Sequence, residues 1–260
     1  MKISATIITF NEAENIREAC ASVAWADEIV VVDSESTDAT RDIAAECGAR
    51  VIVNPWPGFA AQKQFAVDTA RHDWIFSLDA DERVSDELQK TIRALLQRDE
   101  ARLADGYRIA RRAFYLGRWI RGGGWYPDLQ LRLFKRTHGS WGLRLIHESV
   151  NMEPSARIET LSGDLLHYSM RDAAHHRQTI EERYAPLGAQ QMFADGKRTS
   201  RVAKVLAGPL TYLRSLVLKG GWRDGRAGLT IAKLAAHHAS LKHEILYEIQ
   251  TQHRNGPARN

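Results

Sequence analysis

Residues 74–82, with the sequence WIFSLDADE, decide the fold of this chain. Five residues, four of them apolar, lead into a segment that carries three carboxylates. A short apolar run bounded by polar residues is typical of a strand buried on both faces, as in a parallel sheet. Because open α/β sheets bind ligands at the carboxyl ends of their strands, we expect Asp79 and Asp81 to lie at a ligand site.

The spacing of Asp79 and Asp81 fits one hard cation. Two carboxylates at a strand end can converge on a single ion, and Mg²⁺ and Mn²⁺ prefer oxygen ligands that they often share with substrate phosphates. The same Asp-x-Asp pattern also arises where aspartates only end a strand and cap the next helix. Taken alone, the motif favours that simpler interpretation, so the choice between a metal site and a helix cap depends on the rest of the sequence.

The first 80 residues alternate between strand and helix patterns. Strands are expected where β-branched and apolar residues run together, at residues 3–10, 28–33, 50–54 and 74–79, with helices between them. This order predicts a parallel sheet with right-handed crossovers. Acids gather at one edge of the sheet, because three strands end in polar residues: Asn11-Glu12, Asp33 and Asp79. The loop at residues 34–37 lacks glycine, which argues against a dinucleotide-type phosphate loop.

Beyond residue 100 the pattern changes. Residues 106–111 and 129–135 alternate between apolar and polar, which predicts half-exposed antiparallel strands. Gly122-Gly123-Gly124 between them predicts a mobile loop. Weaker strand patterns occupy residues 157–161 and 165–168, and from Asp172 onward the chain is expected to be helical.

A chain of 260 residues can hold one large α/β domain with an appendage, or two small domains. Cys20 and Cys47 fit neither a disulfide framework nor a metal-ligand spacing, so a reducing cytoplasm is expected. We see no signal peptide and no apolar stretch near the roughly 20 residues that span a bilayer. Residues 1–170 hold 21 Lys/Arg against 25 Asp/Glu, whereas residues 171–260 hold 15 against 7, so the basic excess suggests an anionic partner for the C-terminal third.

Three segments in order resemble the family-2 inverting glycosyltransferases, which have the GT-A fold. They are residues 6–12 (TIITFNE), 31–38 (VVDSESTD) and 78–82 (LDADE). Residues 126–136 (YPDLQLRLFKR), with Gly139-Ser140-Trp141 and His147-Glu148, are similar to a narrower branch that adds glucose to the inner core of bacterial lipopolysaccharide.

The resemblance implies a mostly parallel, Rossmann-like α/β sheet flanked by helices, with an antiparallel extension and a helical C-terminal region. Residues 1–100 would form the nucleotide-sugar-binding half of the catalytic domain and residues 101–170 its acceptor-binding half. Residues 171–260 would form the helical region.

The resemblance also implies a UDP-sugar donor. Six residues match donor-binding positions: Thr9, Asn11, Glu12, Asp33, Lys63 and Asp79. It implies a divalent ion, Mg²⁺ or Mn²⁺, with Asp81 as the direct ligand and Asp79 as a ribose or indirect contact. Simpler interpretations remain for three of these residues: Asp33 as a helix cap, Glu12 as a solvated acid and Lys63 as an exposed helix lysine.

Displacing a sugar from a diphosphate needs a base for the acceptor hydroxyl. Asp128 matches the family's base, although Pro127 stands where the family usually has Glu. Glu148 is the other candidate, and both acids could instead lie in surface turns. His147 could complete the metal site, since imidazole accepts Mn²⁺, or be structural. Three aromatic residues near the glycine loop are expected to bind the acceptor rather than serve only as core, with the glycines as hinges: Trp125, Tyr126 and Trp141.

The C-terminal region contains a basic, amphipathic helix pattern between residues 201 and 219. Its apolar face comprises Val202, Val205, Leu206, Pro209, Leu210, Leu213, Leu216 and Val217. Such a helix can lie in an anionic membrane interface or pack on the catalytic domain, and the two interpretations stay open.

We therefore expect a metal-dependent inverting glycosyltransferase. It would move a hexose, glucose in the first instance, from a UDP-sugar to a lipid-linked saccharide such as the lipopolysaccharide inner core, peripherally at the inner face of the cytoplasmic membrane. Two alternatives are a nucleotidyltransferase of related fold, against which the acidic, glycine-free segment after the first strand argues, and a non-catalytic membrane or nucleic-acid adaptor. We expect no nucleic-acid partner.

Overall fold

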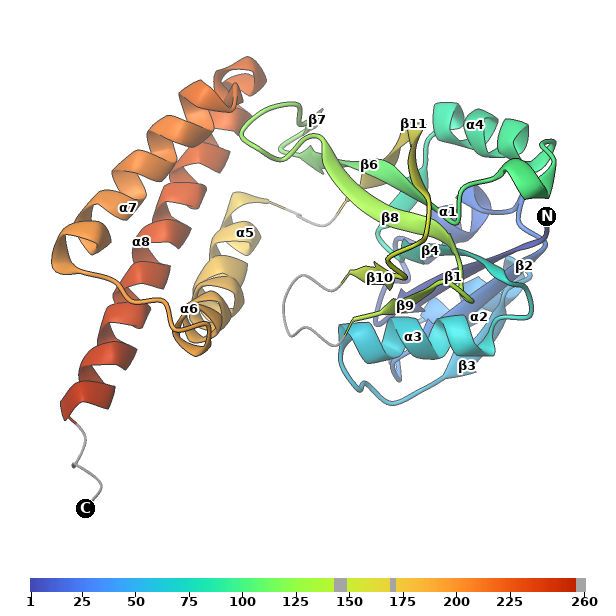
Figure 1. Cartoon of the computed structure of the whole chain (residues 1–260), viewed down its shortest axis with the longest axis horizontal. Coiled ribbons are helices and arrows are strands. Elements are labelled where there is room, and N and C mark those ends of the chain that lie inside the picture. Colours follow the sequence, from blue (N-terminus) through green and yellow to red (C-terminus); the bar gives the residue numbers. More distant parts are fainter. Residues whose placement is uncertain (143–148, 169–171, 256–260) are drawn as a thin grey trace. The chain divides into compact units, whose positions relative to one another are not determined.

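The computed structural model describes residues 1–142, 149–168 and 172–255, and it divides into two compact units (Figure 1). The first, here called the sheet unit, comprises Met1–Arg112 and Asp128–Ser169. The second, the helical unit, comprises Ala113–Pro127 and Met170–Asn260. None of the helices in the described part of the chain is both long and apolar enough to cross a membrane.

The first half of the sheet unit is parallel. Its strands are β1 (Ile3–Thr9), β2 (Glu28–Asp33), β3 (Arg50–Val53) and β4 (Trp74–Asp79), in the spatial order β3-β2-β1-β4. They are joined by α1 (Ile16–Ser22), α2 (Thr40–Glu46) and α3 (Phe59–Thr69). Each strand pairs in parallel with its neighbour, as the alternation of strand and helix patterns predicts.

An antiparallel extension continues the sheet beyond β4. β8 (Asp128–Lys135) pairs antiparallel with β4 and with β6 (Gly106–Tyr115), followed by β11 (Ile158–His167) and β5 (Glu82–Val84). The two weak strand patterns predicted at residues 157–161 and 165–168 are parts of this one strand, β11. The remaining elements of the sheet unit are α4 (Asp86–Leu96), η1 (Glu100–Arg102) and the separate β-ribbon of β9 (Gly139–Trp141) and β10 (Val150–Met152). β7 (Arg118–Trp119) pairs with the last residues of β6 and belongs to the helical unit.

The main hydrophobic core lies where the parallel strands meet the helices. Ile7, Val31, Phe76 and Leu78 are fully buried, as expected for strands covered on both faces. Because adjacent parallel strands stay in register, their carboxyl ends fall together: Thr9 lies opposite Asp33, and Ile8 lies opposite Asp79. The core therefore fixes the strand ends that carry the polar residues.

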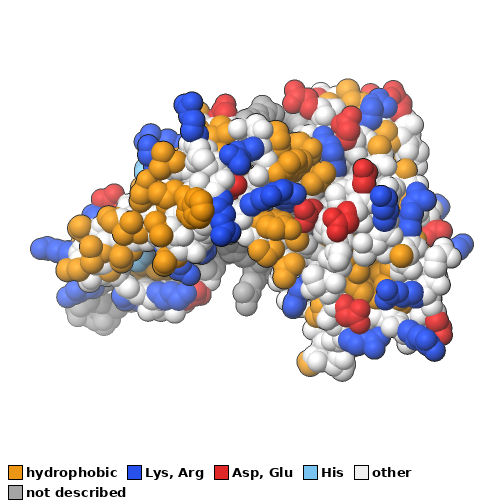
Figure 2. Space-filling model, turned by 90° about the horizontal axis from the view of Figure 1, so that it is seen from above, with side chains coloured by type: hydrophobic (Ala, Val, Ile, Leu, Met, Phe, Trp, Pro, Cys, Tyr) orange, Lys and Arg blue, Asp and Glu red, His pale blue; other side chains and the backbone are white. Residues whose placement is uncertain are grey.

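The helical unit is built from α5 (Ala173–Thr179), the π-helical segment η2 (Ile180–Tyr184), α6 (Ala185–Ala194), α7 (Arg201–Leu213), the π-helical segment η3 (Arg214–Leu218), η4 (Gly221–Asp224) and α8 (Gly225–Asn255). α8 is 31 residues long. Hydrophobic side chains gather on the surface over the helical region (Figure 2). The observed architecture confirms the predicted fold class, a mostly parallel α/β sheet with an antiparallel extension and a helical C-terminal region.

Candidate active site

The loops after β1 and β2 are joined by hydrogen bonds. Asn11 N donates to Ser36 Oγ at 2.8 Å, and Asn11 Oδ1 accepts from Thr37 N at 2.9 Å. Asp33, fully buried, accepts from Ser36 N at 2.8 Å. Glu12 N donates to Thr40 Oγ1 at 2.8 Å. Asp33 thus holds its own loop in place directly beside Thr9, and it does not cap α2, whose N-cap is Ala39 without a side-chain hydrogen bond.

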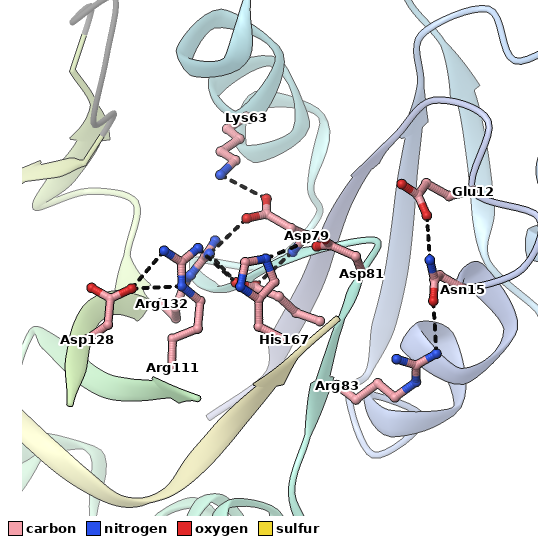
Figure 3. A network of polar contacts seen from close by, with 11 residues as sticks. Glu12, Asn15, Lys63, Asp79, Asp81, Arg83, Arg111, Asp128, Arg132 and His167 are labelled. Carbon is pink, nitrogen blue, oxygen red and sulfur yellow. Dashed lines mark hydrogen bonds and ion pairs between the residues drawn. The ribbon is translucent and has the colours of Figure 1, made fainter. Parts of the chain in front are cut away.

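Asp79 is held by two cations, one from a helix and one from a strand. Lys63 Nζ of α3 lies 2.8 Å from Asp79 Oδ1, and Arg132 Nη2 of β8 lies 2.9 Å from Asp79 Oδ2 (Figure 3). Burial acts to raise the pKa of the Asp79 carboxyl, but the charges and hydrogen bonds of Lys63 and Arg132 hold that pKa well below its usual range. Asp79 is therefore an ionised anchor between two positive groups.

The ion pairs continue from Arg132 across the antiparallel strands. Arg132 Nη2 lies 2.7 Å from Glu82 Oε1, and Arg111 Nη1 lies 3.4 Å from the same oxygen. Arg111 reaches Asp128 with Nη2 at 2.7 Å and Nε at 2.9 Å. Charges thus alternate along a connected series, here called the charge chain: Lys63, Asp79, Arg132, Glu82, Arg111 and Asp128.

The charge chain corrects the expectation that residues 129–135 form a half-exposed strand. Arg132 is only 2% exposed, and Glu82 is fully buried. Glu82 Oε2 also accepts a hydrogen bond from Asp79 N at 3.0 Å. Charged side chains are almost never buried unless they are paired, and these two pair with each other. Leu129 occupies an apolar position of the same alternating pattern, yet it is 47% exposed.

Several buried polar atoms around Asp79 have no hydrogen-bond partner among the described residues. They are Nε and Nη1 of Arg132, Nε1 of Trp141 and Oγ1 of Thr9. Trp141 is 7% exposed, and Lys63 Nζ lies 4.8 Å from its ring centroid. Since buried polar groups are nearly always paired, such atoms are expected where a polar ligand binds.

Asp81 faces a histidine that we did not select from the sequence. His167 Nε2, at the end of β11, lies 3.3 Å from Asp81 Oδ2, and both side chains are partly exposed. A carboxylate oxygen beside an imidazole nitrogen is a donor pair that Mn²⁺ accepts, with other ligands supplied by substrate oxygens. These two residues therefore fit a divalent ion, although no cluster of three or more His, Cys, Asp or Glu is found within the described ranges.

Three other predicted site residues, Glu12, His147 and Glu148, are not part of the charge chain as the structure describes it. Glu12 accepts from Asn15 Nδ2 at 2.7 Å, and Asn15 Oδ1 accepts from Arg83 Nη2 at 3.1 Å, so Glu12 belongs to a local group beside α1 and not to the charge chain. Two predicted residues, His147 and Glu148, lie outside the described residues.

The three aromatic residues that were predicted to bind the acceptor lie in different units. Trp141 lies in the sheet unit beside Lys63. Trp125 lies in the helical unit, where its ring centroid is 5.3 Å from that of Tyr115 and 5.4 Å from that of His176. Tyr126 is joined to Pro127 by a cis peptide bond.

The glycine loop is packed at Gly122, which corrects the expectation of a mobile hinge there. A Cβ at Gly122 would stand 2.3 Å from the Gly220 carbonyl oxygen. Gly122 N also donates to the buried carboxylate of Asp224 at 2.7 Å. The close backbone approach, and not a need for motion, explains the glycine at this position.

Comparison with known proteins identifies relatives along most of the chain. Residues 4–152 match the family model described as glycosyl transferase family 2. The chain is 31% identical over 255 residues to the lipopolysaccharide core biosynthesis glycosyltransferase LpsC of Rhizobium meliloti, covering 95% of this chain and 93% of that protein. It is 30% identical over 266 residues to an uncharacterized glycosyltransferase of Rickettsia typhi, covering 98% and 89%.

Solved structures show a more distant likeness. S. aureus TarS in complex with UDP-GlcNAc aligns with a TM-score of 0.48 and 15% identity, over 100% of this chain and 93% of that one. Glucosyl-3-phosphoglycerate synthase from Mycobacterium tuberculosis, in complex with Mn²⁺ and UDP, aligns with a TM-score of 0.35 and 24% identity over 45% and 44%. The extent of the family match and the identity to LpsC decide the assignment: this chain belongs to glycosyl transferase family 2.

Proposed function

We propose that this glycosyltransferase is metal-dependent and inverting, and that it moves a hexose, glucose in the first instance, from a UDP-sugar to a lipid-linked saccharide such as the lipopolysaccharide inner core. The observation that carries the donor site is the set of buried polar atoms without partners around the ion-paired Asp79. The 31% identity to a lipopolysaccharide core glycosyltransferase supports the acceptor class.

The donor would occupy the edge formed by β1, β2 and β4. Thr9 and Asp33 lie side by side at the ends of β1 and β2 and suit contacts with the base and ribose. Asn11 and Glu12 lie in the loop that follows. Lys63 and Arg132 provide positive charge beside Asp79, and Arg132 has two buried nitrogens, Nε and Nη1, whose N–H groups can donate to phosphate or ribose oxygens.

Asp81 and His167 would hold the divalent ion, Mg²⁺ or Mn²⁺. When bound, the ion offsets the negative charge that develops on the leaving diphosphate, as a Lewis acid. Asp79 already carries a cation against each of its oxygens, so we assign it to the ribose and to positioning rather than to direct coordination. His147 remains a further candidate ligand.

Asp128 is the proposed general base. As the acceptor oxygen forms its bond to the anomeric carbon, the bond from that carbon to the diphosphate oxygen breaks and UDP leaves. The proton of the acceptor hydroxyl passes to the Asp128 carboxylate. Attack from the face opposite UDP inverts the configuration at that carbon. Arg111 holds Asp128 through two nitrogens, which fixes the carboxylate for this role. Glu148 remains the second candidate.

The acceptor would reach Asp128 from the half formed by residues 101–170, with residues 1–100 binding the donor. Aromatic faces suit sugar rings, which assigns an acceptor contact to Trp141 in the sheet unit, and Trp125 and Tyr126, in the helical unit, remain the other two candidates. A lipid-linked acceptor places the reaction in the cytoplasm at the inner face of the cytoplasmic membrane, with the helical residues 171–260 as the region that meets the bilayer.

The test combines turnover with binding. UDP release from UDP-glucose is measured with Mn²⁺ for the wild type and for Asp81→Ala, with Asp73→Ala, an acid 69% exposed in the same unit, as the control. We expect Asp81→Ala to lose about 10²- to 10³-fold in turnover, as for other removed electrostatic groups. Calorimetry should show that its UDP binding no longer depends on Mn²⁺, while Asp73→Ala matches the wild type.

Three outcomes would contradict the proposal. Retained metal-dependent turnover in Asp81→Ala would remove the metal site from this edge. Release of pyrophosphate instead of UDP would indicate a nucleotidyltransferase chemistry. Absence of UDP binding at millimolar concentration would indicate that the site does not take this donor.

A further inference from the structure

α7 and the two short segments after it, η3 and η4, place their apolar side chains outward. Eight large hydrophobic residues on these segments are between 45% and 81% exposed. They form what is here called the apolar face: Val202, Val205, Leu206, Leu210, Leu213, Val217, Leu218 and Trp222. Single exposed hydrophobic residues are ordinary, but a series along one helix is the pattern of an interaction surface.

The opposite side of α7, which packs on α8, carries small and polar residues. Gly208 is buried, and a Cβ there would stand 2.3 Å from Ser240 Oγ of α8. Lys204 Nζ forms an ion pair with Glu244 Oε1 of α8 at 2.9 Å, and Arg201 Nε donates to Tyr247 Oη at 3.1 Å. A helix that packs only on its own unit normally does the reverse, since its apolar stripe faces the core.

The segments that carry the apolar face supply charge of one sign, although Arg201 and Lys204 point to α8. Between Asp195 and Asp224 the chain has seven Lys and Arg residues and no acid. Arg214 and Lys219 are exposed on the same segments, and Arg223 lies with its guanidinium carbon 5.4 Å from the Trp222 ring centroid. Figure 2 shows Lys and Arg side chains bordering the hydrophobic ones in this region.

We propose that the apolar face lies in the headgroup region of an anionic bilayer, with its basic border against the lipid phosphates. A basic helix with a continuous apolar face, and a tryptophan beside it, has the composition of an interfacial helix. α7 has 13 residues, which at about 1.5 Å each reach roughly 20 Å, short of the ~30 Å hydrocarbon core, so it lies along the surface.

Charge also decides between a bilayer and a second copy of this chain. A two-fold interface on this face would bring the same basic border of each copy together, and like charges in contact disfavour association. Anionic lipid instead attracts each Lys or Arg near its surface. The inference rests on the membrane location in the proposed function and names the surface that would meet the bilayer, but because this surface belongs to the helical unit alone, it is tested independently of the donor chemistry.

The experiment measures co-sedimentation of the full-length protein with vesicles of phosphatidylcholine containing about one-third phosphatidylglycerol, and with pure phosphatidylcholine vesicles. Wild-type protein should sediment with the anionic vesicles, and raised salt should weaken this binding because exposed charges are screened. Pure phosphatidylcholine should retain much less.

Variants separate the apolar and basic contributions. Leu210 and Leu218 are 60% and 81% exposed in the protein. Leu210→Glu and Leu218→Glu should each weaken vesicle binding about tenfold or more, because each removes a leucine that the bilayer would bury and adds an acid. Arg214→Glu should weaken binding to anionic vesicles by about fivefold or more and leave weak binding to neutral vesicles unchanged. Val53→Glu in β3, 49% exposed in the sheet unit, is the matched control and should bind as the wild type does.

Three results would overturn the inference. The first is wild-type protein that stays in the supernatant with anionic vesicles. The second is Leu210→Glu and Leu218→Glu binding as well as Val53→Glu. The third is a dimer in analytical ultracentrifugation that these two substitutions dissociate, with no vesicle binding. UDP release with a soluble sugar acceptor, measured on the same variants, should be unchanged, so loss of membrane binding is distinguishable from loss of the enzyme.

Discussion

The two units of this protein depart from the usual distribution of residues in opposite ways. The sheet unit buries charge: Arg132 is 2% exposed and Glu82 is fully buried. The helical unit exposes apolar side chains: Val205 is 70% exposed and Leu218 is 81% exposed. Globular proteins ordinarily bury the second kind and expose the first. Each departure therefore needs a reason outside the stability of its own unit.

Burying charge and exposing apolar surface are unfavourable for different physical reasons, so the two departures have different explanations. Charges taken out of water lose hydration, and well-packed apolar residues often hold a core at least as well as a buried ion pair. The charges of Asp79, at the end of β4, and of Arg132, within β8, are consequently best explained by a ligand that binds there. Exposed apolar surface adds nothing to folding and favours association, so the apolar face is best explained by a surface that covers it.

The largest effect is expected at the exposed end of the charge chain. Asp128→Asn keeps a side chain that can accept hydrogen bonds from Arg111, but it removes the proposed proton acceptor. We expect the rate of sugar transfer to fall by about 10²- to 10⁴-fold with little change in donor binding. Steady-state kinetics and UDP calorimetry check this. The control is Asp164→Asn, another acid paired with an arginine in this unit, through Arg112 at 3.4 Å.

A different result would relocate the base. If Asp128→Asn keeps wild-type kcat while Glu148→Gln loses activity, then Glu148 accepts the proton and the charge chain serves only to position Asp79.

The next effect concerns stability. Glu82→Ala leaves Arg132 without its 2.7 Å partner in a buried site, which should lower the free energy of unfolding by about 3–5 kcal/mol. Urea unfolding near neutral pH measures this. The double variant Glu82→Leu with Arg132→Met should recover much of the stability without recovering activity. Recovery of both would mean that the buried charges serve the fold and not the chemistry.

The parallel half of the sheet could be predicted from the sequence because its signals are local. β1, β2, β3 and β4 are apolar runs of the right length, and the acids that follow two of them are adjacent in sequence. Register between parallel strands then brings Asp33 and Asp79 to one edge without further information. Asp79 and Asp81 could be selected as candidates for the same reason, whereas Asp128, the first residue of β8, could be selected only through the resemblance to the family.

The pairing within the site could not be predicted, because its partners are distant in sequence. Arg132 and Glu82 are 50 residues apart, and only the antiparallel extension brings them together. The alternating pattern of β8 placed Arg132 on the polar side, which predicts exposure unless a buried acid is known to face it. His167 had no spacing signal at all: it reaches Asp81 because β11 pairs with β5, opposite Glu82.

The helical unit shows the same limit in another form. The 3.6-residue period of α7 could be predicted, but a period alone does not say whether the apolar face meets protein or solvent. The packing of Gly208 on Ser240 settles it within this unit, since the small residues face α8.

A third effect, of intermediate size, is the pH dependence of stability that a buried histidine of the helical unit causes. Burial lowers the pKa of His176 to about 4, with smaller contributions from His175 and His238, so His176 is neutral in the folded protein. Above pH 6.5 the unfolded histidine is also neutral. Between pH 6.5 and 4 the unfolded chain binds the proton more readily, so stability falls as the pH falls, by about 2 kcal/mol at pH 5.

His176→Gln should remove this part of the pH dependence, whereas His175→Gln, at the exposed neighbouring position, should retain it. Urea unfolding at pH 7 and pH 5 checks both variants. The same slope in all three proteins would mean that His176 is not shielded from water as its contact with Tyr115, 3.1 Å from Nδ1 to Oη, indicates.

The smallest effect is expected at Leu210, and it tests the comparison most directly when the same substitution is made at a buried leucine in another helix of the same unit. Leu246→Ala, at a fully buried position of α8, should lower the free energy of unfolding by about 2–5 kcal/mol. Leu210→Ala, at a position of α7 that is 60% exposed, should change it by less than about 0.5 kcal/mol. Urea unfolding of both variants in dilute solution measures the difference. Equal losses would mean that the apolar face is covered in solution, and a protein partner would then replace the bilayer as its occupant. Unequal losses would leave Leu210 without a role in folding, so that its apolar character has to come from a surface that the folded protein meets.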